Sequence, residues 1–176
     1  MKEFITQALV LRCVPRGSDR AVDLFTLWLG RVEARMVAGR SIVSKFSPHC
    51  DPLNLLTVRV VKKKRYTLAD AVTIDRFPSV RHSPRALSEG LEALFALRTL
   101  VPKEEPDHRL FHELRRALGE GRLSVRGALV FLGYDPREAH CAYCRGSAVH
   151  VFVPDEGIFF CRSCFAGRND KVVLFV

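Results

Sequence analysis

Four cysteines near the end of the chain constrain its fold more than any other feature. They form two Cys-x-x-Cys pairs, Cys141–Cys144 and Cys161–Cys164, with sixteen residues between the pairs. Two residues between cysteines let both sulfurs of a pair face one metal from a tight turn, and two pairs supply the four thiolates of a closed tetrahedral site. The spacing therefore predicts one structural Zn²⁺ ion bound by Cys141, Cys144, Cys161 and Cys164.

The segment between the two pairs has the pattern of a short β-hairpin. Residues 150–153 are apolar and β-prone, residues 154–157 read Pro-Asp-Glu-Gly, and residues 158–160 run back to the second pair. This is the outline of a zinc ribbon. Two disulfides or four free thiols are the alternatives, and the first residues do not resemble a secretory signal that would favour disulfides. His140 and His150 flank the cysteines as alternative ligands, but four thiolates already complete the set.

The first half of the chain predicts five short strands with little helix between them. They cover residues 4–13, 21–29, 31–38, 53–61 and 66–74, with a hairpin turn at residues 29–31. We expect Ile5, Leu9 and Leu11 to point inward from the first strand. Five such strands predict a small closed or partly closed barrel, of which the oligonucleotide-binding (OB) fold is one form and an SH3-like barrel another.

Three helices are expected between residues 83 and 133, with Ser83, Asp107 and Ser124 as N-caps. The expected apolar faces are Leu87, Leu91, Leu94 and Phe95 in the first helix and Leu110, Phe111, Leu114 and Leu118 in the second. Residues 171–176 predict a terminal strand. The expected fold class is α+β: an OB-like barrel over residues 1–79, a small helical bundle over 80–139, and a zinc ribbon with a terminal strand over 140–176.

The excess positive charge is concentrated in the predicted barrel. The net charge is +9, and residues 1–80 hold 14 basic against 7 acidic residues. This asymmetry favours one polyanion-binding surface, with plain solvated charge as the alternative. The candidate DNA-binding residues lie at turns and strand ends: Arg12, Arg16, Arg20, Arg35, Arg40, Lys45, Lys62, Lys63, Lys64 and Arg65.

In a five-stranded barrel these turns can line one groove that follows a phosphate backbone. Phe46 and Tyr66 are candidates for base stacking, although a core or rim position also explains each of them. Glu104 and Glu105, between two prolines, are interpreted as part of a solvated loop between helices.

Sequence motifs for catalysis are lacking. His112-Glu113 is not followed by a second histidine at zinc-protease spacing, and neither a Walker A loop nor a dinucleotide fingerprint occurs. No apolar stretch reaches the length of a membrane span. We therefore expect a cytoplasmic protein that is not an enzyme and does not enter a membrane.

The order of these parts resembles the bacterial DNA repair and recombination protein O (RecO) family. The resemblance lies in three groups of segments: residues 8–12, 17–20, 24–26 and 30–32; residues 37–40, 44–46 and 52–56; and Leu132-Gly-Tyr134, Pro136 and Cys141-Ala-Tyr-Cys144 with Arg145-Gly146. The central helices match only in kind. The chain also has fewer central helical residues than the resemblance implies, and it stops soon after Cys164.

The resemblance implies a non-enzymatic protein that binds single- and double-stranded DNA and anneals complementary strands. It also implies partnership with RecR and with the tail of single-stranded DNA-binding protein, in support of RecA loading. The sequence leaves a different class open: a zinc-ribbon adaptor between proteins, or an RNA-binding module. An enzyme whose site forms only in three dimensions is a third reading.

Overall fold

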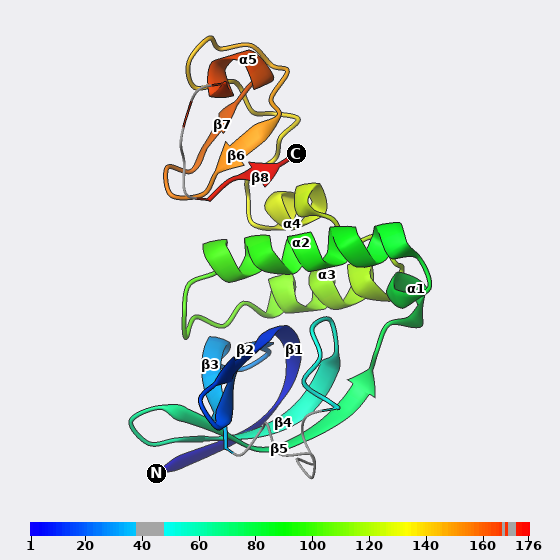
Figure 1. Ribbon diagram of the computed structural model, residues 1–176, viewed down its shortest axis with the longest axis vertical. Helices are drawn as coiled ribbons and strands as arrows, with labels where there is room; N and C mark the ends of the chain where they lie inside the picture. Colours follow the sequence, from blue (N-terminus) through cyan, green and yellow to red (C-terminus); the bar gives the residue numbers. More distant parts are fainter. Residues whose placement is uncertain (38–47, 167, 169–171) are drawn as a thin grey trace.

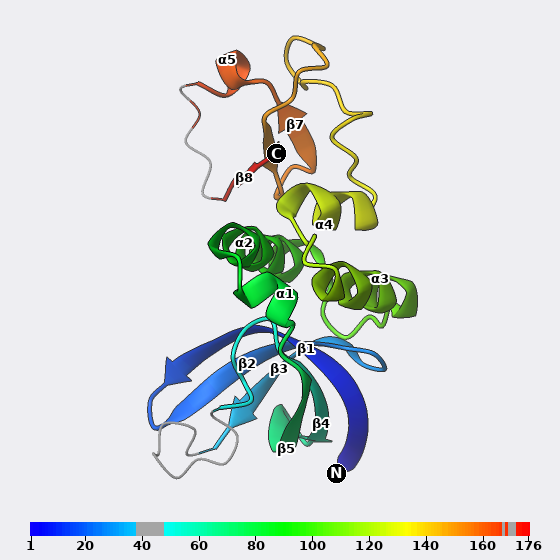
Figure 2. The ribbon, with the colours of Figure 1, turned by 90° about the vertical axis from the view of Figure 1, so that its right-hand side faces the viewer.

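The computed structural model describes residues 1–37, 48–166, 168 and 172–176 as three stacked layers (Figure 1). A β-barrel that begins at the N-terminus forms one end, helices form the middle, and a small sheet that contains the C-terminus forms the other end (Figure 2). The elements are β1 (Lys2–Arg16), β2 (Asp19–Thr26), β3 (Gly30–Met36), β4 (Leu55–Lys62), β5 (Tyr66–Asp75), α1 (Pro78–Arg81), α2 (Pro84–Leu100), α3 (His108–Gly119), α4 (Val125–Phe131), β6 (Val151–Val153), β7 (Ile158–Phe160), α5 (Arg162–Phe165) and β8 (Leu174–Phe175).

The five N-terminal strands form a closed barrel in the order β1-β2-β3-β5-β4. β1 pairs antiparallel with both β2 and β4, and β4 pairs antiparallel with β5. The barrel closes through a short parallel pairing of β3 with β5, at Ala34–Tyr66 and Arg35–Thr67. The predicted α+β class and the five-stranded OB-like barrel are therefore confirmed.

Both faces of β1 are buried along its middle, which simple alternation did not predict. Ala8 and Val10 belong to the core inside the barrel, whereas Leu9 and Leu11 belong to a second core beneath the helices. The expectation that Ile5 points inward is wrong, because its side chain is 68% exposed. The helices cover only one part of the strand, so residues beyond their reach face solvent.

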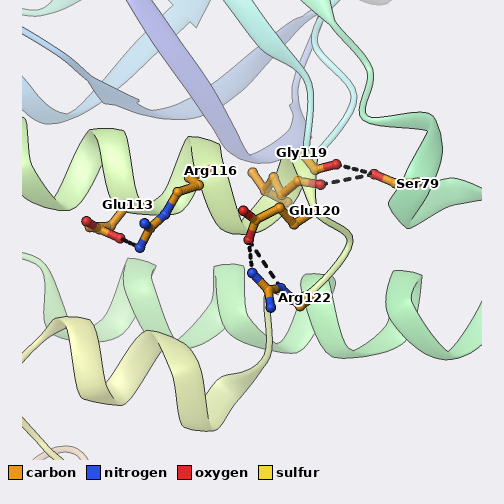
Figure 3. A network of polar contacts seen from close by, with 7 residues as sticks. Ser79, Glu113, Arg116, Gly119, Glu120 and Arg122 are labelled. Atoms are coloured by element: carbon orange, nitrogen blue, oxygen red, sulfur yellow. Dashed lines mark hydrogen bonds and ion pairs between the residues drawn. The ribbon is translucent and has the colours of Figure 1, made fainter.

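The three predicted N-caps are confirmed. The side chains of Ser83, Asp107 and Ser124 accept hydrogen bonds from backbone N–H groups in the first turns of α2, α3 and α4. The short helix α1, which precedes α2, was not predicted from the sequence. The hydroxyl of Ser79 in α1 donates to the carbonyl oxygens of Leu118 and Gly119, at 3.2 and 3.0 Å, and so holds the C-terminal end of α3 (Figure 3).

The predicted apolar face of α2 is wrong in two positions. Leu91 and Phe95 are exposed, and the face that packs against the other elements contains Gly90, Ala93 and Leu97. A Cβ atom at Gly90 would lie 3.4 Å from Leu53 Cδ2, so the small residue lets the helix approach the chain that enters β4. Small residues carry little hydrophobic signal, which is why the sequence pattern favoured the larger leucines.

The last layer is a three-stranded sheet in the order β7-β6-β8. The predicted hairpin is confirmed as β6 and β7, which pair antiparallel, and the predicted terminal strand is the shorter β8 beside β6. Phe152 and Phe159 pack against Val125 and Leu129 of α4 in a core shared with the helices. The sheet is therefore fixed to the helical layer by apolar contacts.

The turn between β2 and β3 lies at residues 27–29, a shift from the predicted turn at residues 29–31. Gly30 opens β3 with a positive φ of 66°. A Cβ atom there would lie 2.1 Å from the carbonyl oxygen of Glu105, in the loop that joins α2 to α3. Gly30 thus permits both the backbone conformation and the close contact between barrel and helices.

Replacing Gly30 with alanine is expected to lower the free energy of unfolding by about 3 kcal/mol, because the left-handed conformation and the steric clash both add cost. Gly17→Ala is the matched control, since Gly17 also has a positive φ but a Cβ atom added there would meet no other atom within 4 Å. We expect Gly17→Ala to cost only about 1 kcal/mol. Urea unfolding of both variants measures the difference, and equal costs would contradict this role of Gly30.

Candidate metal centre and nucleic-acid interface

The sulfurs of Cys141, Cys144, Cys161 and Cys164 all lie within 4.8 Å of one another. The Sγ atoms of Cys144 and Cys161 are 3.7 Å apart. Four thiolates around one tetrahedral zinc ion, with metal–sulfur bonds of about 2.3 Å, place their sulfurs about 3.8 Å apart. The four side chains are therefore arranged to hold a metal ion.

Local hydrogen bonds fix the turn that carries each cysteine pair. In the first pair, the N–H of Arg145 donates to the Cys141 carbonyl at 2.9 Å, and the N–H of Cys141 donates to the Gly146 carbonyl at 2.8 Å. In the second pair, Cys161 is the N-cap of α5, and its sulfur accepts from the N–H of Cys164. Strand β7 leads directly into the second pair, and the carbonyl of its Phe159 accepts from the N–H of Ala142 in the first.

The hydrogen bonds around the sulfurs favour thiolates at two positions. Backbone N–H groups, above all that of Cys144, lower the pKa of Cys141 to about 6. The hydroxyl of Ser163 lowers the pKa of Cys161, whereas the neighbouring Cys161 sulfur raises the pKa of Cys164 to about 12. A metal ion binds the thiolate, so this environment suits a cation among the sulfurs. Among the described residues, neither His140 nor His150 joins the group.

A cavity of about 460 Å³ lies on the barrel beside the α2–α3 loop, and we call it the first basic hollow. Eight of its lining residues are basic and three are acidic. The basic residues are Arg16, Arg20, Arg31, Arg35, Lys62, Lys64, Arg65 and Lys103, and the acidic residues are Asp19, Glu33 and Glu104.

Some of these cations are already paired. Arg16 pairs with Glu33 at 3.1 Å, Arg35 pairs with Asp19, and Lys62 pairs with Glu104. Within the described parts of the chain, no salt bridge joins Lys64, Arg65 or Lys103 to an acidic residue. The hollow therefore keeps a surplus of positive charge that a polyanion can neutralise.

Arg20 adds an unsatisfied donor to the first basic hollow. Its Nε atom is buried without a hydrogen-bond partner among the described residues. Its Nη1 atom donates to the sulfur of Cys13 at 3.8 Å. A buried donor of this kind is costly when no acceptor is supplied.

A second basic hollow adjoins the first at the β4–β5 hairpin. It is lined by Met1, Lys2, Phe4, Lys62, Lys63, Lys64 and Tyr66. Lys62, Lys64 and Tyr66 line both hollows, so the hairpin tip lies between them. The predicted run Lys62–Arg65 therefore contributes to two neighbouring cationic surfaces.

Known proteins that resemble this chain share one name. No family model matches the chain. "DNA repair protein RecO" of Thermodesulfovibrio yellowstonii is 29% identical over 175 residues, which cover 92% of this chain and 70% of the relative. The protein of the same name from Anaeromyxobacter sp. (strain K) is 31% identical over 176 residues, which cover 90% of this chain and 69% of the relative.

The chain belongs to the RecO family of DNA repair proteins.

The chain is shorter than the RecO proteins that it matches. The protein from Geobacter metallireducens is 29% identical over 156 residues, which cover 64% of that relative. The family resemblance drawn from the sequence is confirmed. Among the described residues of this RecO family member, no helix is both long and apolar enough to cross a membrane.

The structure brings together most of the predicted DNA-binding residues, but not all of them. Arg12 lies outside both hollows and pairs with the buried Asp23 at 3.2 Å. Arg40, Lys45 and Phe46 lie outside the described residues. Whether any of the predicted residues contacts DNA stays a prediction.

Sequence reasoning missed two basic residues of the first basic hollow. Arg31 and Lys103 line the hollow although they belong to no basic run. Glu104 lies in the exposed loop between α2 and α3, as the sequence predicts, and its carboxylate also pairs with Lys62. Tyr66 is buried and its hydroxyl donates to Glu104, which agrees with the core position given as the alternative to base stacking. These positions depend on contacts between the α2–α3 loop and the barrel, so no local pattern could have shown them.

Proposed function

We propose that this chain is a DNA repair protein that binds single- and double-stranded DNA through its barrel and anneals complementary strands. The observation that carries the proposal is the surplus of cations in the first basic hollow, on an OB-like barrel of a RecO family member. Phosphate contacts of this kind give salt-dependent affinity with little sequence preference. Neutralising the charge of one strand would allow a second strand to approach and pair.

The four-cysteine cluster is proposed to hold one structural Zn²⁺ ion. Zinc is the metal that four thiolates at this spacing favour, and a complete thiolate set leaves no open position for catalysis. The ion would hold together the two cysteine pairs and the small core formed by Cys141, Val153 and Phe160. The proposed activity requires no covalent chemistry, so we propose that the protein is not an enzyme.

Three units are proposed, as in the sequence interpretation: a DNA-binding barrel over residues 1–79, a helical unit over 80–139 and a zinc ribbon over 140–176. Partnership with RecR and with the tail of single-stranded DNA-binding protein rests on the family resemblance. An exposed apolar cavity of about 350 Å³, lined by Leu91, Phe95 and Phe175 among others, is a place where an apolar tail end would fit. Glu92 also lines it and Arg98 stacks over Phe95, so the charge around it is mixed.

Strand annealing by the purified, zinc-loaded protein tests the proposal. Two complementary labelled oligonucleotides are mixed with and without the protein across a salt series. We expect annealing to be faster with the protein and the acceleration to fade as salt rises, because the phosphate contacts are screened. Absence of both acceleration and DNA binding would overturn the proposal, and would favour an adaptor between proteins. Binding restricted to structured RNA would favour an RNA-binding module.

A further inference from the structure

The carboxylate of Glu104 lines the first basic hollow and contacts two residues that line both hollows. It forms an ion pair with Lys62 and accepts a hydrogen bond from the Tyr66 hydroxyl at 3.2 Å. Lys62 Nζ also lies 4.7 Å from the centre of the Tyr66 ring. Lys62 and Tyr66 each line both hollows, so a phosphate bound in either hollow can approach this pair.

The main chain around Glu104 is fixed to the barrel. The N–H of Glu104 donates to the Arg31 carbonyl at 2.9 Å, and Lys103 forms a parallel bridge with Arg31. The guanidinium of Arg31 in turn donates to the carbonyl of Val101 at 2.8 Å. These contacts tie the backbone of the α2–α3 loop to the barrel, so the Glu104 side chain can leave Lys62 without a change in the main chain.

The side chain itself is weakly held. It is 51% exposed, and Lys62 and Tyr66 are its partners among the described residues. The contact with Lys62 lowers the pKa of Glu104, and the same contact raises the pKa of Lys62, so both groups are charged at neutral pH. An exposed ion pair of this type gives little stability and is sensitive to salt.

Carboxylate and phosphate oxygens are recognised by the same donors, a lysine ammonium group and a hydroxyl. A phosphate at this position would find the contacts that Glu104 now uses. We propose that Glu104 is an internal competitor for nucleic-acid phosphate: its carboxylate occupies the Lys62–Tyr66 position, and bound DNA displaces it. This inference rests on the proposed function, because it requires a polyanion in the basic hollows.

Replacing Glu104 with glutamine tests the proposal, since the substitution keeps the side-chain shape and removes the charge. We expect Glu104→Gln to bind a labelled single-stranded oligonucleotide about three- to fivefold more tightly at low salt, as expected for the loss of one competing exposed pair. The plot of log affinity against log salt should steepen by about one unit, because Lys62 is then available to one more phosphate. Fluorescence anisotropy between about 50 and 200 mM salt measures both quantities.

Glu105→Gln is the matched control, because it removes the same charge from the next residue of the same loop. Among the described residues, Lys62 and Tyr66 direct their polar contacts to Glu104 and not to the Glu105 carboxylate, so we expect less than half of the Glu104→Gln effect. A Lys62→Gln background supplies the second control. In the Lys62→Gln background, the Glu104→Gln variant should bind the oligonucleotide no more tightly than the Glu105→Gln variant, because the proposed competition requires the ammonium group of Lys62.

Two results would overturn the inference in distinguishable ways. If the parent protein binds DNA but Glu104→Gln and Glu105→Gln behave alike, Glu104 contributes only general negative charge, and the proposed function stands without it. If neither the parent nor any variant binds DNA, the proposed function and the competition fail together. Thermal melting of each variant establishes that the compared proteins are folded.

Discussion

Replacing both Cys141 and Cys144 with serine is expected to abolish metal binding and to unfold the part of the ribbon around the cysteines. The change removes half of the proposed ligands, and structural zinc sites of this kind contribute about 10 kcal/mol or more of apparent binding free energy at neutral pH. The core around the cysteines is small, with Cys141, Val153 and Phe160 as its fully buried apolar residues among those described. Such a core does not hold a fold without a metal or a crosslink.

The measurements are metal content by atomic emission and hydrogen exchange across residues 140–176. We expect the variant to hold no metal and to exchange rapidly there, while the barrel keeps its protection, because its core inside the strands is separate. Cys13→Ser is the matched control, since Cys13 lies in β1 and outside the four-cysteine group. It should keep one metal ion per chain.

Treating the unmodified protein with a chelator distinguishes a zinc site from two disulfides. A chelator added to the unmodified protein should release the metal and make four further thiols reactive, whereas two disulfides would release none. Retention of the metal and of the parent melting behaviour by the Cys141→Ser, Cys144→Ser variant would refute the zinc assignment.

Reversing the charges of Lys64 and Arg65 to glutamate is expected to weaken oligonucleotide binding on the order of 100-fold at low salt. Both residues line the first basic hollow and have no salt bridge to a described residue, so their charge is available to phosphate. The salt slope should also fall by about two units, one for each lost contact. The loss should be similar for oligonucleotides of different sequence, because phosphate contacts carry no base information.

The control is the pair Arg85→Glu and Arg115→Glu, which makes the same change in net charge. Arg85 lies at the start of α2 and Arg115 in α3, and neither lines a basic hollow. We expect at most a several-fold loss from these substitutions. Equal losses in the two double variants would show that net charge, and not the hollow, governs binding, and the proposed interface would then be wrong. The measurement is fluorescence anisotropy across a salt series.

Features that depend on neighbours in the sequence were predictable from the sequence alone. The spacing of the cysteines predicted their cluster, because a Cys-x-x-Cys turn fixes the relation of its own two sulfurs. Ser83, Asp107 and Ser124 were predicted as N-caps, because a cap bonds to an N–H only three residues away. The five strands and the ribbon hairpin followed from alternation and turn residues in the same way, with errors of a few residues at their ends.

Contacts between distant segments were decided only by the tertiary structure. Which face of α2 is buried depends on the fit of Gly90 against Leu53, and the burial of Leu9 and Leu11 depends on helices that come much later in the chain. The first basic hollow joins Arg31 of β3 to Lys103 and Glu104 of the α2–α3 loop, which no local pattern connects. The cysteine cluster, the elements and the basic character of the barrel could be predicted from the sequence, because each depends on local spacing or composition. The tertiary structure decided which cations share a surface and which acid lies among them, because those relations are set by packing between elements far apart in the chain.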